Sequence, residues 1–81
     1  MASRPIRFTR GSRKHRIGRA SARHVIDTID PNVETDDITQ AVIIRWVEND
    51  ERDRELEVIA IVRPACQLVV HVMPTHYRRN P

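Results

Sequence analysis

The chain has 81 residues, a formal net charge of +3, 31% charged residues and 40% hydrophobic residues. A chain of this length has room for one domain with a modest core. We expect that domain to span residues 1–81, with flexible ends at 1–5 and 78–81. No apolar stretch approaches the roughly 20 residues of a membrane-spanning helix, and residues 1–22 lack the apolar segment of a secretory signal. The single cysteine, Cys66, excludes an internal disulfide. We therefore expect a cytoplasmic protein with no membrane partner.

The first 32 residues predict a short strand and two helices. Weak alternation of apolar and polar residues over Ile6–Arg10 is typical of a short edge strand. Ser12 is placed to cap a short helix that runs to about Arg16. A second helix is expected from Arg19, because apolar residues then recur at intervals of three and four. The sequence Asp30-Pro31-Asn32 ends it.

The second half of the chain predicts a sheet. The acidic segment Asp30–Gln40 is expected to be a loop, and strands follow at Ala41–Glu48, Glu55–Val62 and Gln67–Met73. The even-numbered residues of these strands are almost all apolar, so we expect them to face the helices together. The predicted fold class is therefore α+β. It has a short N-terminal strand and two helices packed on a three- to four-stranded antiparallel sheet.

The same alternation predicts a polar row on the other face of the sheet. Keeping the even positions together requires paired residue numbers with an even sum. A five-residue loop then places Arg45 opposite Glu57, and a three-residue loop places Glu57 opposite His71. Either the three side chains form a reactive group, or they are a cross-strand ion pair beside a structural histidine.

Charge is unevenly distributed along the chain. All 11 acidic residues lie between Asp27 and Glu57, whereas the first 25 residues contain none. Those 25 residues hold a large share of the 14 basic residues, namely Arg4, Arg7, Arg10, Arg13, Lys14, Arg16, Arg19 and Arg23. Such polarity indicates a polyanionic partner. The alternative is that the basic N-terminal part pairs with the acidic middle.

RNA is the polyanion for which the chain carries suitable chemistry. Cleavage of RNA without a metal needs a base, an acid, cations near the phosphate and a group that orients the nucleotide. Glu57 and His71 are candidates for the base, His15, His71 and Tyr77 for the acid, and Trp46 or Tyr77 for stacking. The candidate RNA-binding residues are Lys14, Arg16, Arg19, Arg45, Arg63, Tyr77 and Arg78. The histidines and Cys66 lack the spacing of zinc ligands, so we expect no metal and no cofactor.

Three stretches resemble a known family. They are Lys14-His15 ahead of a helix, the Leu-Glu-Val strand within Glu55–Ala60, and Val70–Pro74 followed by Tyr77-Arg78-Arg79. Together they resemble the BrnT-like group of small bacterial toxins, which are similar in fold to the RelE superfamily. The resemblance implies an endoribonuclease of a type II toxin–antitoxin system that inhibits translation and is neutralised by a cognate antitoxin. The site residues it implies are Lys14, His15, Glu57, His71 and Arg78.

Two other functions stay open from the sequence alone. One is a non-catalytic module that grips RNA or DNA by charge, in which Lys14 and His15 are a solvated helix end. The other is a partner-binding protein that docks an antitoxin or a second copy of itself, forming a homodimer. Its docking face would be the second face of the sheet, with Ile43, Val47, Ile59, Ile61, Val69 and Met73.

Overall fold

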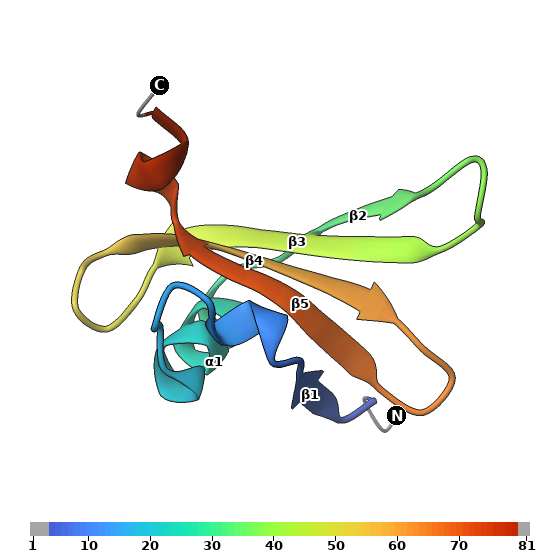
Figure 1. The fold of residues 1–81 in the computed structure, drawn as a ribbon, viewed down its shortest axis with the longest axis horizontal. Coiled ribbons are helices and arrows are strands. Elements are labelled where there is room, and N and C mark those ends of the chain that lie inside the picture. Colours follow the sequence, from blue (N-terminus) through green and yellow to red (C-terminus); the bar gives the residue numbers. More distant parts are fainter. Residues whose placement is uncertain (1–3, 80–81) are drawn as a thin grey trace.

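The structure is a computed structural model that describes residues 4–79. Within them, five strands form one sheet in the order β1-β5-β4-β3-β2 (Figure 1). The strands are β1 (Ile6–Phe8), β2 (Asn32–Thr35), β3 (Val42–Asn49), β4 (Glu55–Val62) and β5 (Gln67–Pro74). The helices are α1 (Arg19–Thr28) and two 3₁₀-helices, η1 (Gly11–Arg13) and η2 (Thr75–Arg79). β1 runs parallel to β5, and the other neighbouring strands are antiparallel.

The predicted fold class is wrong. The described chain has one α-helix on a five-stranded mixed sheet, rather than two helices on an antiparallel sheet of three or four strands. The expected short helix is reduced to the 3₁₀ turn η1, because the Ser12 hydroxyl donates backward to the Thr9 carbonyl at 2.6 Å rather than capping a helix. The helix expected from Arg19 is present as α1 and ends at Thr28.

The acidic segment contains a strand that the sequence analysis missed. β2 pairs with β3 from Asn32 opposite Arg45 to Thr35 opposite Val42. All four of its residues are exposed, so burial imposed no apolar alternation on the sequence. The three predicted strands are present, and their bounds differ from the expected ones by at most one residue at each end.

The core lies between α1 and the sheet. Its buried members are Ile17, Ala22, Val25, Ile44, Trp46, Leu56, Val58, Ala60, Val69 and Val72. The even-numbered rule holds in β3 and β4 but fails in the first half of β5, where Val69 is fully buried. The cause is a bulge: Ile59 pairs with His71, but the next residue, Ala60, pairs with Val69. The extra residue, Val70, reverses the facing of the residues before it.

The helix α1 covers only one face of the sheet. In Figure 1, α1 lies below the sheet and η2 stands on the upper side, at the end of β5. No helix of the described part is long and apolar enough to cross a membrane. Of the expected flexible ends, residues 1–3 and 80–81 lie outside the described range. The Pro5 carbonyl accepts a hydrogen bond from the Gln67 amide at 2.9 Å.

Candidate functional site

A pair of hydroxyl residues attaches the basic N-terminal segment to β5. The amide and the hydroxyl of Thr9 both donate to the Val69 carbonyl, at 3.0 Å and 3.1 Å. Ser12, which is 1% exposed, closes the turn back onto Thr9. Since β1 pairs only with the first part of β5, η1 and the residues after it follow the rest of that strand. This brings Lys14 and His15 to the β5 edge.

Glu57 is the buried centre of the site. Its side chain is 4% exposed, on the sheet face away from α1. One carboxylate oxygen lies 3.5 Å from Nε of Arg45, and the other lies 3.2 Å from Nε2 of His71. The Arg45 side chain is 43% exposed and that of His71 is 32% exposed. The carboxylate is therefore shielded, while both of its neighbours reach solvent.

The His71–Glu57 contact is close but not aligned as a hydrogen bond. Nε2 of His71 is shielded from solvent and has no hydrogen-bond partner in the described structure, although a Glu57 oxygen is 3.2 Å away. Hydrogen bonds at active sites are often poorly aligned in the free protein and tighten only when substrate is bound. The exposed part of the His71 ring is then accessible to a molecule that binds from solvent.

The predicted strand pairings are wrong, yet the predicted group forms. Glu57 pairs with Val47 and Met73, and both Arg45 and His71 pair with Ile59. Each register is thus displaced by two residues at this point, which keeps the same side chains on the same face. Arg45 and His71 reach Glu57 as diagonal neighbours, which long side chains in a sheet can do.

Two aromatic residues from distant parts of the chain join the group. The His15 ring is 6.4 Å from the His71 ring and 5.3 Å from the Tyr77 ring, centre to centre, and both contacts are edge-on. Tyr77 lies on η2 and is 46% exposed. His76 in turn packs on Tyr77 at 4.6 Å. The site therefore combines the N-terminal segment, β3, β4, β5 and η2.

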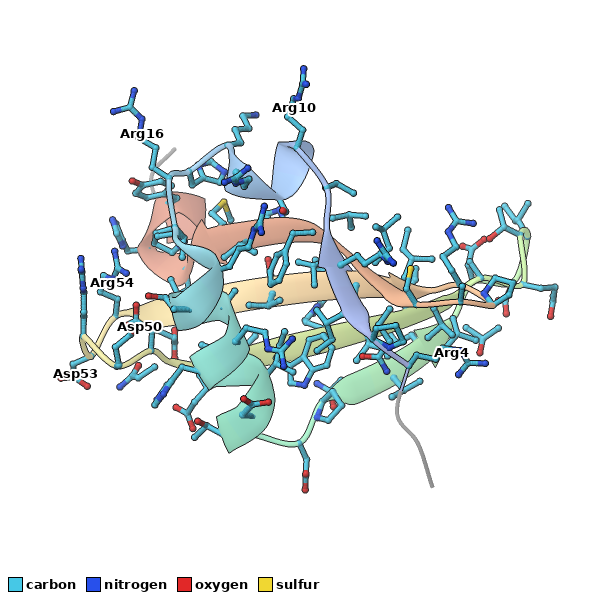
Figure 2. The ribbon with its side chains drawn as sticks, turned by 90° about the horizontal axis from the view of Figure 1, so that it is seen from below. Arg4, Arg10, Arg16, Asp50, Asp53 and Arg54 are labelled. Atoms are coloured by element: carbon cyan, nitrogen blue, oxygen red, sulfur yellow. The ribbon has the colours of Figure 1, made fainter. Side chains whose placement is uncertain are left out.

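Exposed cations precede and follow His15 along the chain. Lys14 directly follows η1 and is exposed, as is Arg19 at the start of α1. Figure 2 shows Arg10 and Arg16 projecting away from the sheet on the η1 side. Arg16 has φ 60°, a left-handed conformation that is uncommon for a residue with a side chain. The Arg16 side chain thus projects outward from a turn whose backbone conformation favours glycine.

Two predicted residues, Arg63 and Trp46, do not join the cluster, and the side chain of a third is not described. Arg63 follows β4 in the loop to β5, at the opposite end of the strand from Glu57. Trp46 is 4% exposed within the core, so it cannot stack on a nucleotide. Arg78 belongs to η2, but its side chain lies outside the described part of the structure.

Sequence reasoning missed the residues that hold the site together. Thr9 and Ser12 lie on either side of Gly11, and this composition, which is typical of turns, is the one sequence feature that indicates their role in closing the turn.

The β3–β4 turn is closed by Asp50 and Arg54, whose ion pair measures 2.7 Å (Figure 2). Within residues 4–79, no group of three or more His, Cys, Asp or Glu is arranged to hold a metal ion.

Comparisons of the chain with protein-family models, with curated proteins and with solved structures found no match.

Proposed function

We propose that this protein is a metal-independent endoribonuclease of the toxin kind, acting in the cytoplasm and neutralised by a cognate antitoxin. The observation that carries the proposal is a series of contacts: the shielded carboxylate of Glu57 lies beside His71, the His71 ring lies beside His15, and His15 lies beside Tyr77. Two histidines, a buried carboxylate and nearby cations are the groups that RNA cleavage without a metal requires. The sequence resemblance to BrnT-like toxins points the same way.

In this proposal His71 is the base. Glu57 is shielded, so it acts through His71 as a positioning residue rather than touching RNA. If the carboxylate accepts the Nε2 proton, Nδ1 of His71 carries the free electron pair. Nδ1 then removes the proton of a ribose 2′-hydroxyl, and the 2′-oxygen attacks the adjacent phosphorus.

His15 is the acid in this scheme. As the bond from phosphorus to the 5′-oxygen breaks, protonated His15 delivers a proton to that oxygen, which leaves a 2′,3′-cyclic phosphate. Arg45 and Lys14 balance the charge that develops on the phosphate. The exposed ring of Tyr77 offers a surface on which a base stacks.

The test is cleavage of a labelled RNA by the full chain in the presence of a metal chelator. We expect His71→Ala and His15→Ala to lower the rate by about 10²–10⁴-fold each, with RNA affinity nearly unchanged. Glu57→Gln should lower the rate and also shift its pH profile, because the base loses the group that fixes its tautomer. His24→Ala is the control, since His24 is an exposed residue of α1, which packs on the opposite face of the sheet from Glu57.

Three outcomes contradict the proposal. Full activity of His71→Ala removes His71 from the mechanism. Loss of activity on adding the chelator implies metal catalysis. RNA binding that weakens with salt but yields no cut strand identifies a non-catalytic binding module.

In cells, expression of the protein should arrest growth, and co-expression of the antitoxin should relieve the arrest.

A further inference from the structure

One row of side chains crosses the entire sheet from edge to edge. The strand register pairs Arg7 with Leu68, Leu68 with Ile61, Ile61 with Ile43, and Ile43 with Glu34. Directly paired residues point to the same side of a sheet. The row therefore begins with a cation on β1, passes over three aliphatic side chains and ends with a carboxylate on β2.

This row lies on the face that α1 leaves uncovered. Ile44 and Ala60 are buried against α1, so alternation directs their neighbours Ile43 and Ile61 to the other side. η2 stands near the other end of β4, where the Thr75 hydroxyl lies 2.6 Å from a carboxylate oxygen of Glu55. The end of the face that carries the row is free of other elements of the described chain (Figure 1).

The row is complementary to a second copy of itself. A two-fold axis that lies between two stacked sheets, parallel to β4, exchanges the two edges of the sheet. It places Ile61 on Ile61 of the second copy, Leu68 over Ile43, and Arg7 over Glu34. Within residues 4–79 neither Arg7 nor Glu34 takes part in an ion pair, so both are available for this contact.

The chemistry of the row is less suited to RNA. Surfaces that bind single-stranded RNA use aromatic rings on which bases stack, and the row has only aliphatic side chains at its centre. The carboxylate of Glu34 would also repel phosphate. Stacked aliphatic faces are instead the way in which two sheets pack, about 10 Å apart.

We propose that the chain forms a two-fold dimer through this face, with Arg7 of each copy paired with Glu34 of the other. The inference does not depend on RNA cleavage, because the row lies at the other end of β4 from Glu57. The five strands span about 19 Å and the full length of β4 about 26 Å, so the whole face measures about 500 Å². The footprint per copy is smaller than this, because η2 stands at the other end of the face. A standard interface buries about 800 Å² per partner, so we expect a weak, concentration-dependent dimer.

Charge exchange at the two edges tests the interface directly. Arg7→Glu and Glu34→Arg each create two repulsive contacts in a homodimer, and each should raise the dissociation constant about tenfold or more at low salt. The double variant Arg7→Glu/Glu34→Arg should dimerise like the wild type. The two single variants, when mixed, should form a heterodimer, because both of its edge pairs are then attractive. The measurement is sedimentation equilibrium of the full chain up to about 500 µM.

Contacts within one molecule cannot explain the expected recovery of dimerisation in the double variant. Arg7 and Glu34 lie on opposite edges of the sheet, about 19 Å apart, so they cannot restore each other in a monomer. A third variant, Ile61→Asp, should abolish the dimer, and Ile38→Asp is its control, since Ile38 is 91% exposed at the tip of the β2–β3 hairpin.

Three results would overturn the inference. The first is a wild-type chain that is monomeric at every concentration. The second is a dimer whose dissociation constant does not respond to the charge variants. The third is loss of RNA binding in Ile61→Asp with a monomeric wild type, which would assign the face to RNA.

Discussion

At the scale of single residues, two buried carboxylates are each held by an arginine from the same hairpin. Glu57 on β4 lies beside Arg45 on β3, and Asp50 in the β3–β4 turn is paired with Arg54. In both pairs the arginine is more exposed than the acid. The buried charge is therefore balanced without burying the cation, whose desolvation would cost more than the pairing returns.

Asp50 has the denser set of partners. One carboxylate oxygen of Asp50 accepts hydrogen bonds from the backbone amides of Arg52 and Arg54, each at 2.9 Å. The other oxygen accepts a hydrogen bond from Nε of Arg54 at 2.9 Å. Burial by itself raises the pKa of this carboxyl. The hydrogen bonds from Arg54 and Arg52 outweigh burial and hold the pKa below its ordinary value of 3.8.

The first prediction concerns Asp50→Asn. The variant keeps the size of the side chain but loses the charge, and we expect it to lower the free energy of unfolding by about 1–3 kcal/mol at neutral pH. Because the folded-state pKa lies below 3.8, the wild-type advantage is complete above that pH and is lost as pH falls through the lower pKa. Urea unfolding at about pH 7 and about pH 2.5 measures both values. An equal difference at the two pH values would contradict this account.

At the scale of elements, the bulge in β5 sets which side chains enter the core. Val69 is fully buried, whereas Val70 and Leu68 are partly exposed. The same bulge lies beside the Val69 carbonyl that accepts both donors of Thr9. One irregularity thus completes the core and fixes the point from which η1 and His15 extend along β5.

The second prediction tests this facing with two matched substitutions. Val69→Thr places a hydroxyl in the core and should cost about 1–3 kcal/mol of unfolding free energy. Val70→Thr makes the same chemical change on the bulge residue and should stay within about 0.5 kcal/mol of the wild type. Urea unfolding of the two variants side by side gives the comparison. Equal losses would contradict the bulge assignment, and a larger loss for Val70→Thr would reverse it.

At the scale of the whole molecule, the segregation of charge along the sequence becomes a segregation in space. The basic segment follows β1 and the β5 edge, with Arg10 and Arg16 projecting outward (Figure 2). The acidic segment forms β2 and its hairpin at the opposite edge. The single α-helix of residues 4–79 lies across one face between them. The exposed cations of the β1–β5 edge therefore support the proposed binding of RNA on that side.

The third prediction is the salt dependence of RNA binding. Each phosphate neutralised on single-stranded RNA contributes about −0.7 to the slope of log affinity against log salt. Lys14→Ala should weaken binding and reduce the slope by about that amount, because Lys14 is exposed beside His15. Arg63→Ala should leave affinity and slope unchanged, because Arg63 lies at the far end of β4. Binding titrations at several salt concentrations give both slopes, and equal effects of the two variants would count against the proposed edge.

Local patterns in the sequence were enough for α1 and for β3, β4 and β5. The strand at Glu55–Val62 and the helix from Arg19 were predicted because burial on one face imposes a period of two or of about 3.6 residues. The residues that gather around Glu57 were also named in advance. Alternation keeps Arg45, Glu57 and His71 on one face under any register shift of two residues. The error in the predicted register therefore did not change which side chains share that face.

Only the tertiary structure decided how the elements meet. The strand β2 is wholly exposed, so nothing in its own residues requires it to be a strand; pairing with β3 does. The parallel pairing of β1 with β5 joins backbone groups far apart in the chain. No local period encodes that pairing or the bulge at Val70. His15 and Tyr77 reach His71 through those same long-range contacts. The residues of the site could thus be identified from the sequence. The contacts that bring them together depend on backbone pairing that only the folded chain can make.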